Sequence, residues 1–357
     1  MRLVAERIYL DHASTTPILP EAAAAMDEAC RFWANPSSPH AEGRAVRAAM
    51  EGARRRIGAA LGWEGTIVFT SGATEAISLV FAQARAGSSI VSAIEHPAVL
   101  RSAPDARRSA VRAGGLVDLE DLDLALQQAE APLVAVQSVN NETGAIQPTA
   151  EVAERVRRSG GLLLCDCAQS AAKLPIPDCD FAVVAAHKLG GPPGIGALLV
   201  RDPGRLDAVG GQEGGFRAGT PAVPLIMGFA AALEADHGWY EEARRLRSKL
   251  DQGVSSAGGE IVAEPAARIA TIGAYRMPGV PGAAQMMQLD LAGIAVSAGS
   301  ACSSGSLKTS HVLTAMGYPE EEAREVIRVS FGPKTGEADI DALLAQWRVM
   351  FEKRRAA

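Results

Sequence analysis

The chain has 357 residues, of which 48% are hydrophobic and 21% are charged, and its formal net charge is −6. This length predicts one large and one smaller domain, and the composition excludes an intrinsically disordered chain. The negative charge disfavours a surface for nucleic-acid phosphates, and no apolar run reaches the ~18 residues of a membrane-spanning helix. Since MRLVAERIYLDHASTTP carries no signal-peptide core, we expect a cytoplasmic protein with no nucleic-acid or membrane partner.

Short apolar runs alternate with helix-like stretches between residues 66 and 202. The runs are TIVFT, SSIVSAI, PLVAVQSV, GGLLLCDC, DFAVVAA and GALLVRD. Because each run is continuously apolar rather than alternating, it is typical of a parallel strand covered by helices on both faces. The pattern predicts an α/β architecture.

The stretch from Pro221 to about Leu250 is rich in Ala, Leu, Glu and Arg and predicts one or two long helices that leave the sheet. Beyond it, ARIATIGAYRM, GIAVSAG and EVIRVSFG are expected to be strands, and helices are expected near residues 283–291, 311–316 and 337–353. These elements predict a small α+β domain. The expected division is a large domain of residues 14–247 and a small domain formed by residues 1–13 and 248–357.

Three reactive side chains lie at the ends of two neighbouring apolar runs. Asp166 ends one run, and His187 and Lys188 end the next, so all three are expected at the carboxyl ends of strands, where α/β sheets bind ligands. An aspartate there can keep a pyridinium nitrogen protonated while a lysine forms a Schiff base, as pyridoxal 5'-phosphate (PLP) requires. The alternative is that Asp166 caps a helix and Lys188 is solvated.

The segment TSGATEAIS, residues 70–78, predicts a strand, a turn of small residues and a helix. Backbone N–H groups at the start of such a helix, together with the Thr74 hydroxyl, can hold a phosphate dianion. The alternative is an ordinary capping turn over Ser71 to Thr74.

An ordered series of motifs resembles the NifS/IscS-like cysteine desulfurases, which belong to the class V, fold type I PLP enzymes. The motifs are YLDHASTTP (9–17), NPSSPH (35–40), VFTSGATEA (68–76), EHPAV (95–99), VNNETGAIQP (139–148), DCAQS (166–170), HKLGGPPGIGAL (187–198), FRAGTP (216–221), VSAGSACSSGSL (296–307) and IRVSFG (327–332).

The resemblance implies the PLP-dependent transferase fold type I: a large domain with a mostly parallel seven-stranded sheet covered by helices, plus a small α+β domain. It also implies a homodimeric L-cysteine desulfurase. Such an enzyme converts L-cysteine to L-alanine and transfers the sulfur to Cys302 as a persulfide. A sulfur-acceptor protein then receives the sulfur for iron–sulfur cluster assembly or thiolation.

The resemblance also implies the roles of individual residues. Lys188 would form the Schiff base, Asp166 would pair with the pyridine nitrogen, and His96 would stack on the ring and handle protons. The remaining implied contacts are Ala73, Thr74, His187 and Thr220 (the last from a second subunit) to the phosphate, Asn141 and Gln169 to the ring hydroxyl, and Arg328 and Asn35 to the substrate carboxylate. No metal site is expected. Structural alternatives are a His96 that orders the turn before Pro97, loop amides at Asn141 and Gln169, and an outward Arg328 on an edge strand.

Cys302 distinguishes desulfurases from other members of the class. The chain has five cysteines, an odd number without framework spacing, so free thiols are expected. Cys302 lies among Ser and Gly in residues 298–310, which predicts a mobile loop with an exposed, reactive thiol rather than a small buried hydrophobe. Cys165 and Cys167 flank Asp166 on an apolar run and are predicted to be core residues.

Four positions depart from the family pattern. Ala185 replaces a serine whose hydroxyl usually bonds the phosphate, Gly190 replaces a tyrosine, Pro193 replaces a lysine, and Gly214 replaces an arginine. Two alternative functions therefore stay open. One is another class V reaction, such as transamination, epimerisation or selenocysteine lyase activity, and the other is a non-catalytic scaffold for sulfur transfer.

Overall fold

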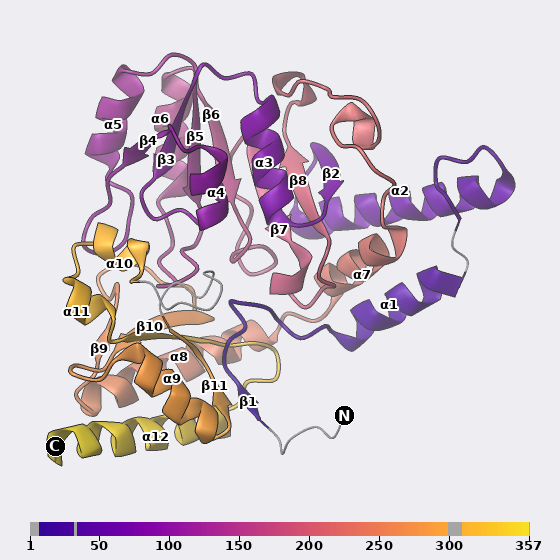
Figure 1. Cartoon of the computed structure of the whole chain (residues 1–357). Helices are drawn as coiled ribbons and strands as arrows, with labels where there is room; N and C mark the ends of the chain where they lie inside the picture. The colour runs from indigo at the N-terminus through magenta and orange to yellow at the C-terminus, as the bar shows by residue number, and fades with distance from the viewer. Residues whose placement is uncertain (1–6, 32–33, 299–308, 357) are drawn as a thin grey trace.

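The computed structural model describes residues 7–31, 34–298 and 309–356 (Figure 1). The strands are β1 (Ile8–Tyr9), β2 (Thr66–Thr70), β3 (Ser88–Ser92), β4 (Arg107–Ser109), β5 (Pro132–Gln137), β6 (Leu162–Asp166), β7 (Phe181–Ala185), β8 (Gly196–Val200), β9 (Glu260–Ile261), β10 (Ile272–Arg276), β11 (Ile294–Ala295), β12 (Ser297–Ala298) and β13 (Val326–Ser330). The helices are α1 (Pro20–Arg31), α2 (Ala41–Leu61), α3 (Ala73–Gln83), α4 (Pro97–Ser102), α5 (Leu119–Gln127), α6 (Thr149–Arg158), α7 (Val223–Glu234), α8 (Trp239–Ser256), α9 (Gly282–Leu291), α10 (His311–Ala315), α11 (Glu320–Ala323) and α12 (Glu337–Ala356). Short 3-10 helices cover Ala186–Lys188, Pro203–Arg205 and Glu213–Gly215.

The large sheet has seven strands in the order β2-β8-β7-β6-β5-β3-β4. All six apolar runs form strands of this sheet, so the α/β prediction is confirmed. β8 runs antiparallel to both β7 and β2, whereas the other pairs are parallel. A short connection joins β7 to β8 and holds no crossover helix, so these two strands pair antiparallel. The sequence pattern missed β4, because its three residues, Arg-Arg-Ser, carry no apolar signal.

Both faces of this sheet are buried, which explains the continuously apolar runs. On β6, Leu163 and Cys165 belong to one hydrophobic cluster with residues of α1, α2, α5, α6 and α7. The alternate residues Leu162 and Leu164 belong to a second cluster with α3 and α4. In Figure 1, α3 and α4 lie in front of the sheet. Helices on both faces leave the strand ends as the place where polar side chains gather.

A second, smaller unit is built on the antiparallel sheet β12-β13-β10-β9 and on the parallel pair β1-β11. Helices α8, α9 and α12 pack against it, in the lower half of Figure 1. Its core includes Trp347, Tyr275 and Phe331. The helix α8 contributes Leu246 and Leu250 to this core, so the predicted boundary at residue 247 falls inside that helix. The exact division into two domains stays a prediction.

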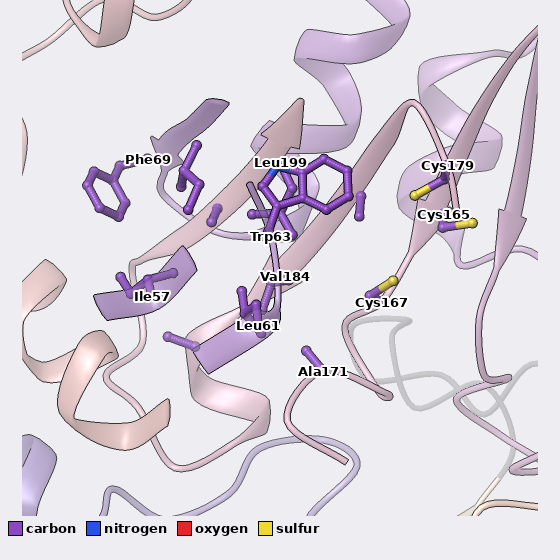
Figure 2. Close-up of a cluster of buried hydrophobic side chains, with 14 of the residues drawn as sticks. Ile57, Leu61, Trp63, Phe69, Cys165, Cys167, Ala171, Cys179, Val184 and Leu199 are labelled. Carbon is purple, nitrogen blue, oxygen red and sulfur yellow. The ribbon is translucent and has the colours of Figure 1, made fainter. Parts of the chain in front are cut away.

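Three cysteines lie in the core of the large sheet. Figure 2 shows Cys165, Cys167 and Cys179 close to one another among buried hydrophobic side chains. The prediction that Cys165 and Cys167 are core residues is confirmed, since both are fully buried. Among the described residues, none of the helices combines the length and apolar character needed to cross a bilayer.

Candidate functional site

A cavity of about 520 Å³ lies at the carboxyl ends of the central strands of the large sheet. Its walls include Asp166 from the end of β6, Lys188 from the 3-10 helix after β7, and Thr74 from the start of α3. β13 of the small sheet contributes Arg328. The cavity therefore joins segments that are far apart in the sequence. It lies at the edge of the sheet where the sequence predicts a ligand site.

The amine of Lys188 lies at the floor of this cavity, against the N-terminal segment. Lys188 Nζ donates hydrogen bonds to Ala13 O at 2.5 Å and to Ser14 O at 2.8 Å. Thr16 Oγ1 donates to Lys188 O at 3.1 Å and fixes the backbone of the same residue. The alternative of a solvated lysine is excluded, because the side chain is held on two carbonyl groups inside the cavity.

Asp166 presents a buried carboxylate to the cavity, 8% exposed as a residue. Its Oδ1 accepts a hydrogen bond from Ala168 N at 2.9 Å, so it also orders the turn after β6. Burial raises the pKa of Asp166, and the Ala168 N–H and the charge of Lys188 lower that pKa by less. A cation placed against this carboxylate would favour its ionised form.

The start of α3 forms the opposite wall. Gly72, Ala73 and Thr74 line the cavity, and no side chain caps this helix. The first backbone N–H groups of α3 and the positive end of its dipole are thus available to an anion. A Cβ on Gly196 would lie 2.8 Å from Gly72 Cα, so glycine at 196 permits β8 to approach this turn closely.

Two histidines line the same cavity. His96 is the N-cap of α4, and its Nδ1 accepts a hydrogen bond from Ala98 N at 3.1 Å. His96 therefore also orders the turn around Pro97, which is the structural alternative for this residue. His187 Nδ1 lies 3.2 Å from Thr15 Oγ1. Burial first and Lys188 second lower the pKa of each imidazole to about 4. Both rings are therefore neutral at pH 7.

Arg328 faces the cavity and is 7% exposed, so the alternative of an outward arginine is excluded. One terminal nitrogen donates to Asp11 Oδ1 at 2.8 Å and to Ser14 Oγ at 2.7 Å. The other donates to Asn141 O at 2.9 Å. This network holds the guanidinium plane in place at the cavity wall.

Asn141 and Gln169 are both at the cavity wall, and the structure brings them together with the residues above. Gln169 is buried, and its Nε2 donates to Ala13 O at 2.9 Å, the same carbonyl that accepts from Lys188. Asn140, the neighbour of Asn141, is fully buried. Its Oδ1 accepts hydrogen bonds from Glu142 N and Thr143 N, which stabilise the turn.

Thr220 and Asn35 do not line the cavity, and both are exposed. The loop that carries Thr220 is fixed to the large sheet at two points. Glu213 accepts from Arg54 and from Phe69 N, each at 2.7 Å, and Arg217 donates to Glu75 at 2.8 Å. Thr220 thus lies on an anchored loop, exposed and outside the lining of the cavity of its own chain.

Cys302 lies outside the described residues, but both flanks of its segment are described. Ser297 pairs with Arg328 across β12 and β13. On the other flank, Ser310 is fully buried, and its Oγ donates to Glu142 Oε2 at 2.5 Å. Arg328 and Glu142 both line the cavity, so the described flanking residues Ser297 and Ser310 each contact a residue of the cavity wall.

Two of the departures from the family pattern have a structural explanation. Gly190 adopts φ +87°, and a Cβ there would lie 2.6 Å from Leu19 Cγ, so Leu19 occupies the space that a larger residue needs. Gly214 adopts φ +68°, which favours glycine. Ala185 and Pro193 line the cavity, and nothing in the structure explains the choice of these residues.

Sequence reasoning missed three cavity-wall or flanking residues. Asp11 and Ser14, which hold Arg328, lie within the motif YLDHASTTP, but nothing in that motif indicates a contact 317 residues away. Glu142 lies in VNNETGAIQP beside Asn141. Glu142 could have been noticed in the sequence, because it is a carboxylate inside an otherwise neutral motif.

The fold and the cavity define a class of protein: an α/β enzyme whose central sheet has helices on both faces and carries a lysine, a buried carboxylate and a helix start at one edge. The family described as aminotransferase class-V matches residues 8–343. A cysteine desulfurase of Cereibacter sphaeroides is 36% identical over an alignment that covers 98% of this chain and 97% of that protein. Cysteine desulfurase IscS 1 of Archaeoglobus fulgidus is 34% identical over 98% of each chain.

Solved structures agree with these relatives. A NifS-like protein from Rickettsia africae has a TM-score of 0.89, is 31% identical, and is matched over 99% of this chain and 100% of its own. SspA, solved in complex with cysteine, has a TM-score of 0.79, is 29% identical, and is matched over 92% of this chain and 100% of its own. The chain belongs to the aminotransferase class-V family and, within it, to the cysteine desulfurases. The predicted family and fold type are confirmed.

Proposed function

We propose that the cavity binds PLP, with Lys188 as the residue that attaches it covalently. The observation that carries this proposal is the arrangement of Lys188, Asp166 and the α3 start around one cavity of about 520 Å³. The polar groups around the cavity match the chemical groups of the cofactor. The buried Asp166 carboxylate suits a protonated ring nitrogen, the N–H groups at Ala73 and Thr74 suit a phosphate, and the amine of Lys188 suits an aldehyde.

When bound, PLP supplies an electron sink that acidifies the Cα–H bond of an amino acid. The chain's own residues then position the substrate and move protons. Lys188 is the group placed to remove and return the Cα proton, and neutral His96 can accept a proton from the incoming substrate. Asn141 and Gln169 are neutral amides suited to a ring hydroxyl.

The substrate that we propose is L-cysteine, and the reaction releases L-alanine. Arg328 offers a fixed, planar guanidinium to the substrate carboxylate. The similarity to cysteine desulfurases, and to SspA solved in complex with cysteine, supports this substrate.

We propose that the Cys302 thiol attacks the sulfur of the substrate. Cys302 then carries this sulfur as a persulfide, and the rest of the substrate is released as L-alanine. Cys302 follows Ala298 by four residues, a span of at most ~14 Å, and Ala298 adjoins the strand pair that contains Arg328. The short chain separation from Ala298 supports the proposal that Cys302 serves this cavity. Cys165 and Cys167 cannot serve, because they are buried in the core and their pKa values are raised well above the ordinary range. A hydrogen bond to Cys179 is the main cause for Cys165, and burial is the main cause for Cys167.

The proposed active form is a homodimer in the cytoplasm. Thr220 is exposed on an anchored loop and does not line its own cavity, which suits a contact with the phosphate in the partner's cavity. Exposed Asn35 has a similar place outside its own cavity. A sulfur-acceptor protein, for iron–sulfur cluster assembly or thiolation, would receive the persulfide sulfur. Free thiols suit a reducing compartment.

Incubation of the PLP-loaded protein with L-cysteine and a thiol reductant tests the reaction class. We expect equal amounts of alanine and sulfide. Pyruvate or 3-mercaptopyruvate in place of alanine would instead support a different class V reaction. A protein that stays colourless with PLP would support a non-catalytic scaffold.

Arg328→Lys is expected to raise KM for L-cysteine by ~10- to 150-fold, because a bidentate charged contact worth ~1.5–3 kcal/mol is lost. PLP loading should be unchanged, since Arg328 serves the substrate rather than the cofactor. Steady-state kinetics and the visible absorbance of the bound cofactor check both points. An unchanged KM would remove Arg328 from the substrate site.

Ala185→Ser is expected to tighten PLP binding by ~10- to 150-fold, because it adds one hydroxyl donor to a phosphate, worth ~1.5–3 kcal/mol. Ala185 lies at the end of β7 on the cavity wall, so the hydroxyl faces free volume. Equilibrium dialysis against PLP measures the change without any turnover. Ala185→Gly, which adds no donor, is the matched control and should not tighten binding. Equal affinities of the serine variant and the parent protein would show that the phosphate lies elsewhere.

A further inference from the structure

A second lysine, Lys173, lines a small cavity together with Lys188. Lys173 belongs to the turn after β6, which also carries Asp166 and Gln169. Its Nζ donates to Gln169 O at 3.2 Å. Burial first and the charge of Lys188 second lower the pKa of Lys173, and no ion pair of Lys173 with a carboxylate is found among the described residues. A lysine without an acidic partner at such a position calls for an explanation.

Lys173 and Lys188 line the same small cavity, of about 20 Å³, which is large enough for one water molecule. Lys188 also lines the main cavity, so the same residue borders both spaces. Two ammonium groups across so small a volume repel each other, and the repulsion favours the uncharged form of one of them. Burial and Lys188 lower the pKa of Lys173 to about 8, so at pH 7 Lys173 still carries most of its proton.

The other titratable groups around the two lysines do not replace this charge. His12 interacts with Lys173, but burial first and Lys173 second lower the pKa of His12 to about 4, so the ring is neutral at pH 7. Asp236 and His237, from the connection between α7 and α8, border the small cavity. Asp236 is exposed, so water screens its charge.

On the main-cavity side, Asp166 faces Lys188 with a negative charge that favours the protonated form of Lys188. His96 and His187 are neutral there. The charge of Lys173 therefore acts on the Lys188 amine in the opposite sense to the charge of Asp166.

We propose that Lys173 is a positioning residue for the proposed reaction: its positive charge, held in a cavity that it shares with Lys188, disfavours protonation of the Lys188 nitrogen. An unprotonated amine is what both steps assigned to Lys188 require, attachment of the cofactor and removal of the Cα proton. Lys173 touches neither substrate nor cofactor in this account. The inference rests on the proposed function, because it concerns Lys188 as the attachment point of PLP.

A pH titration of the PLP-loaded protein, followed by visible absorbance, tests the inference. The absorbance change reports protonation of the nitrogen that joins Lys188 to the cofactor. In Lys173→Met the midpoint should rise by about one pH unit, because a nearby cation is lost. Lys173→Arg keeps the charge, so its midpoint should stay at or below that of the parent protein. The pH dependence of kcat should shift in the same direction as the absorbance midpoint in each variant.

Methionine is an unbranched side chain only one heavy atom shorter than lysine and introduces no charge, so Lys173→Met is expected to fold. Asp236→Asn is the matched control at the same small cavity and should leave the midpoint within about 0.2 pH units, because its carboxylate is solvent-screened. An equal midpoint in Lys173→Met and the parent protein would overturn the inference while leaving PLP binding intact. A shift of equal size in Lys173→Arg would also overturn it, since charge would then not be the cause. Absence of any visible absorbance with PLP would instead overturn the proposed function itself.

Discussion

Cys302→Ala is expected to abolish persulfide formation while leaving PLP bound. The substitution removes the thiol that accepts the substrate sulfur, and no residue of the cofactor site changes. Alanine production should fall by about 10³-fold, which corresponds to ~4 kcal/mol in the transition state. Quantification of alanine under steady-state conditions, with the visible absorbance of the cofactor as a check on loading, measures both effects.

Cys30→Ala is the matched control, because Cys30 is the exposed thiol of α1 and does not line the cavity. It should retain full activity. If Cys302→Ala produced alanine and sulfide at the parent rate, Cys302 would have no part in sulfur transfer. A drop of equal size in both variants would point to a general effect of cysteine loss instead.

Lys188→Ala is expected to remove the covalent attachment of PLP and to slow alanine formation by ~10²- to 10⁴-fold, the usual contribution of a positioned acid or base. The lost Nζ also leaves Ala13 O and Ser14 O without this donor, so a modest loss of stability is expected. Reduction with borohydride followed by peptide mass measurement tests attachment directly. The parent protein should carry the cofactor mass on Lys188.

Lys353→Ala, at an exposed position on α12, is the control for this experiment and should keep both attachment and activity. A Lys188→Ala protein that still carried covalently bound PLP would require another lysine as the attachment point. Lys173, the lysine that shares the small cavity with Lys188, would then be the first to examine.

The central sheet could be predicted because its strands are buried on both faces. β5 and β6, for example, are fully buried along their length, so their apolar runs stand out in the sequence. The positions of Asp166 and Lys188 followed from the ends of these runs. The motif series then resembled a family whose fold and membership the structure and the relatives confirm.

Other features could not be predicted, because they depend on contacts between distant segments. β4 lacks an apolar run and is a strand because it pairs with β3. Asp11 meets Arg328 only because the N-terminal segment crosses between the two sheets, through the bridge from Asp11 to Ser330. The shared cavity of Lys173 and Lys188 likewise depends on how two separate turns pack.

Mass measurement of the peptide that contains Cys302, after incubation of the PLP-loaded protein with L-cysteine in the absence of reductant, tests the central claim most directly. We predict an increase of one sulfur atom, about 32 Da, on Cys302 that a thiol reductant removes. The peptides with Cys165, Cys167 and Cys179 should keep their masses, because these thiols are buried. An unmodified Cys302 peptide in a protein that nevertheless produces alanine would contradict the account.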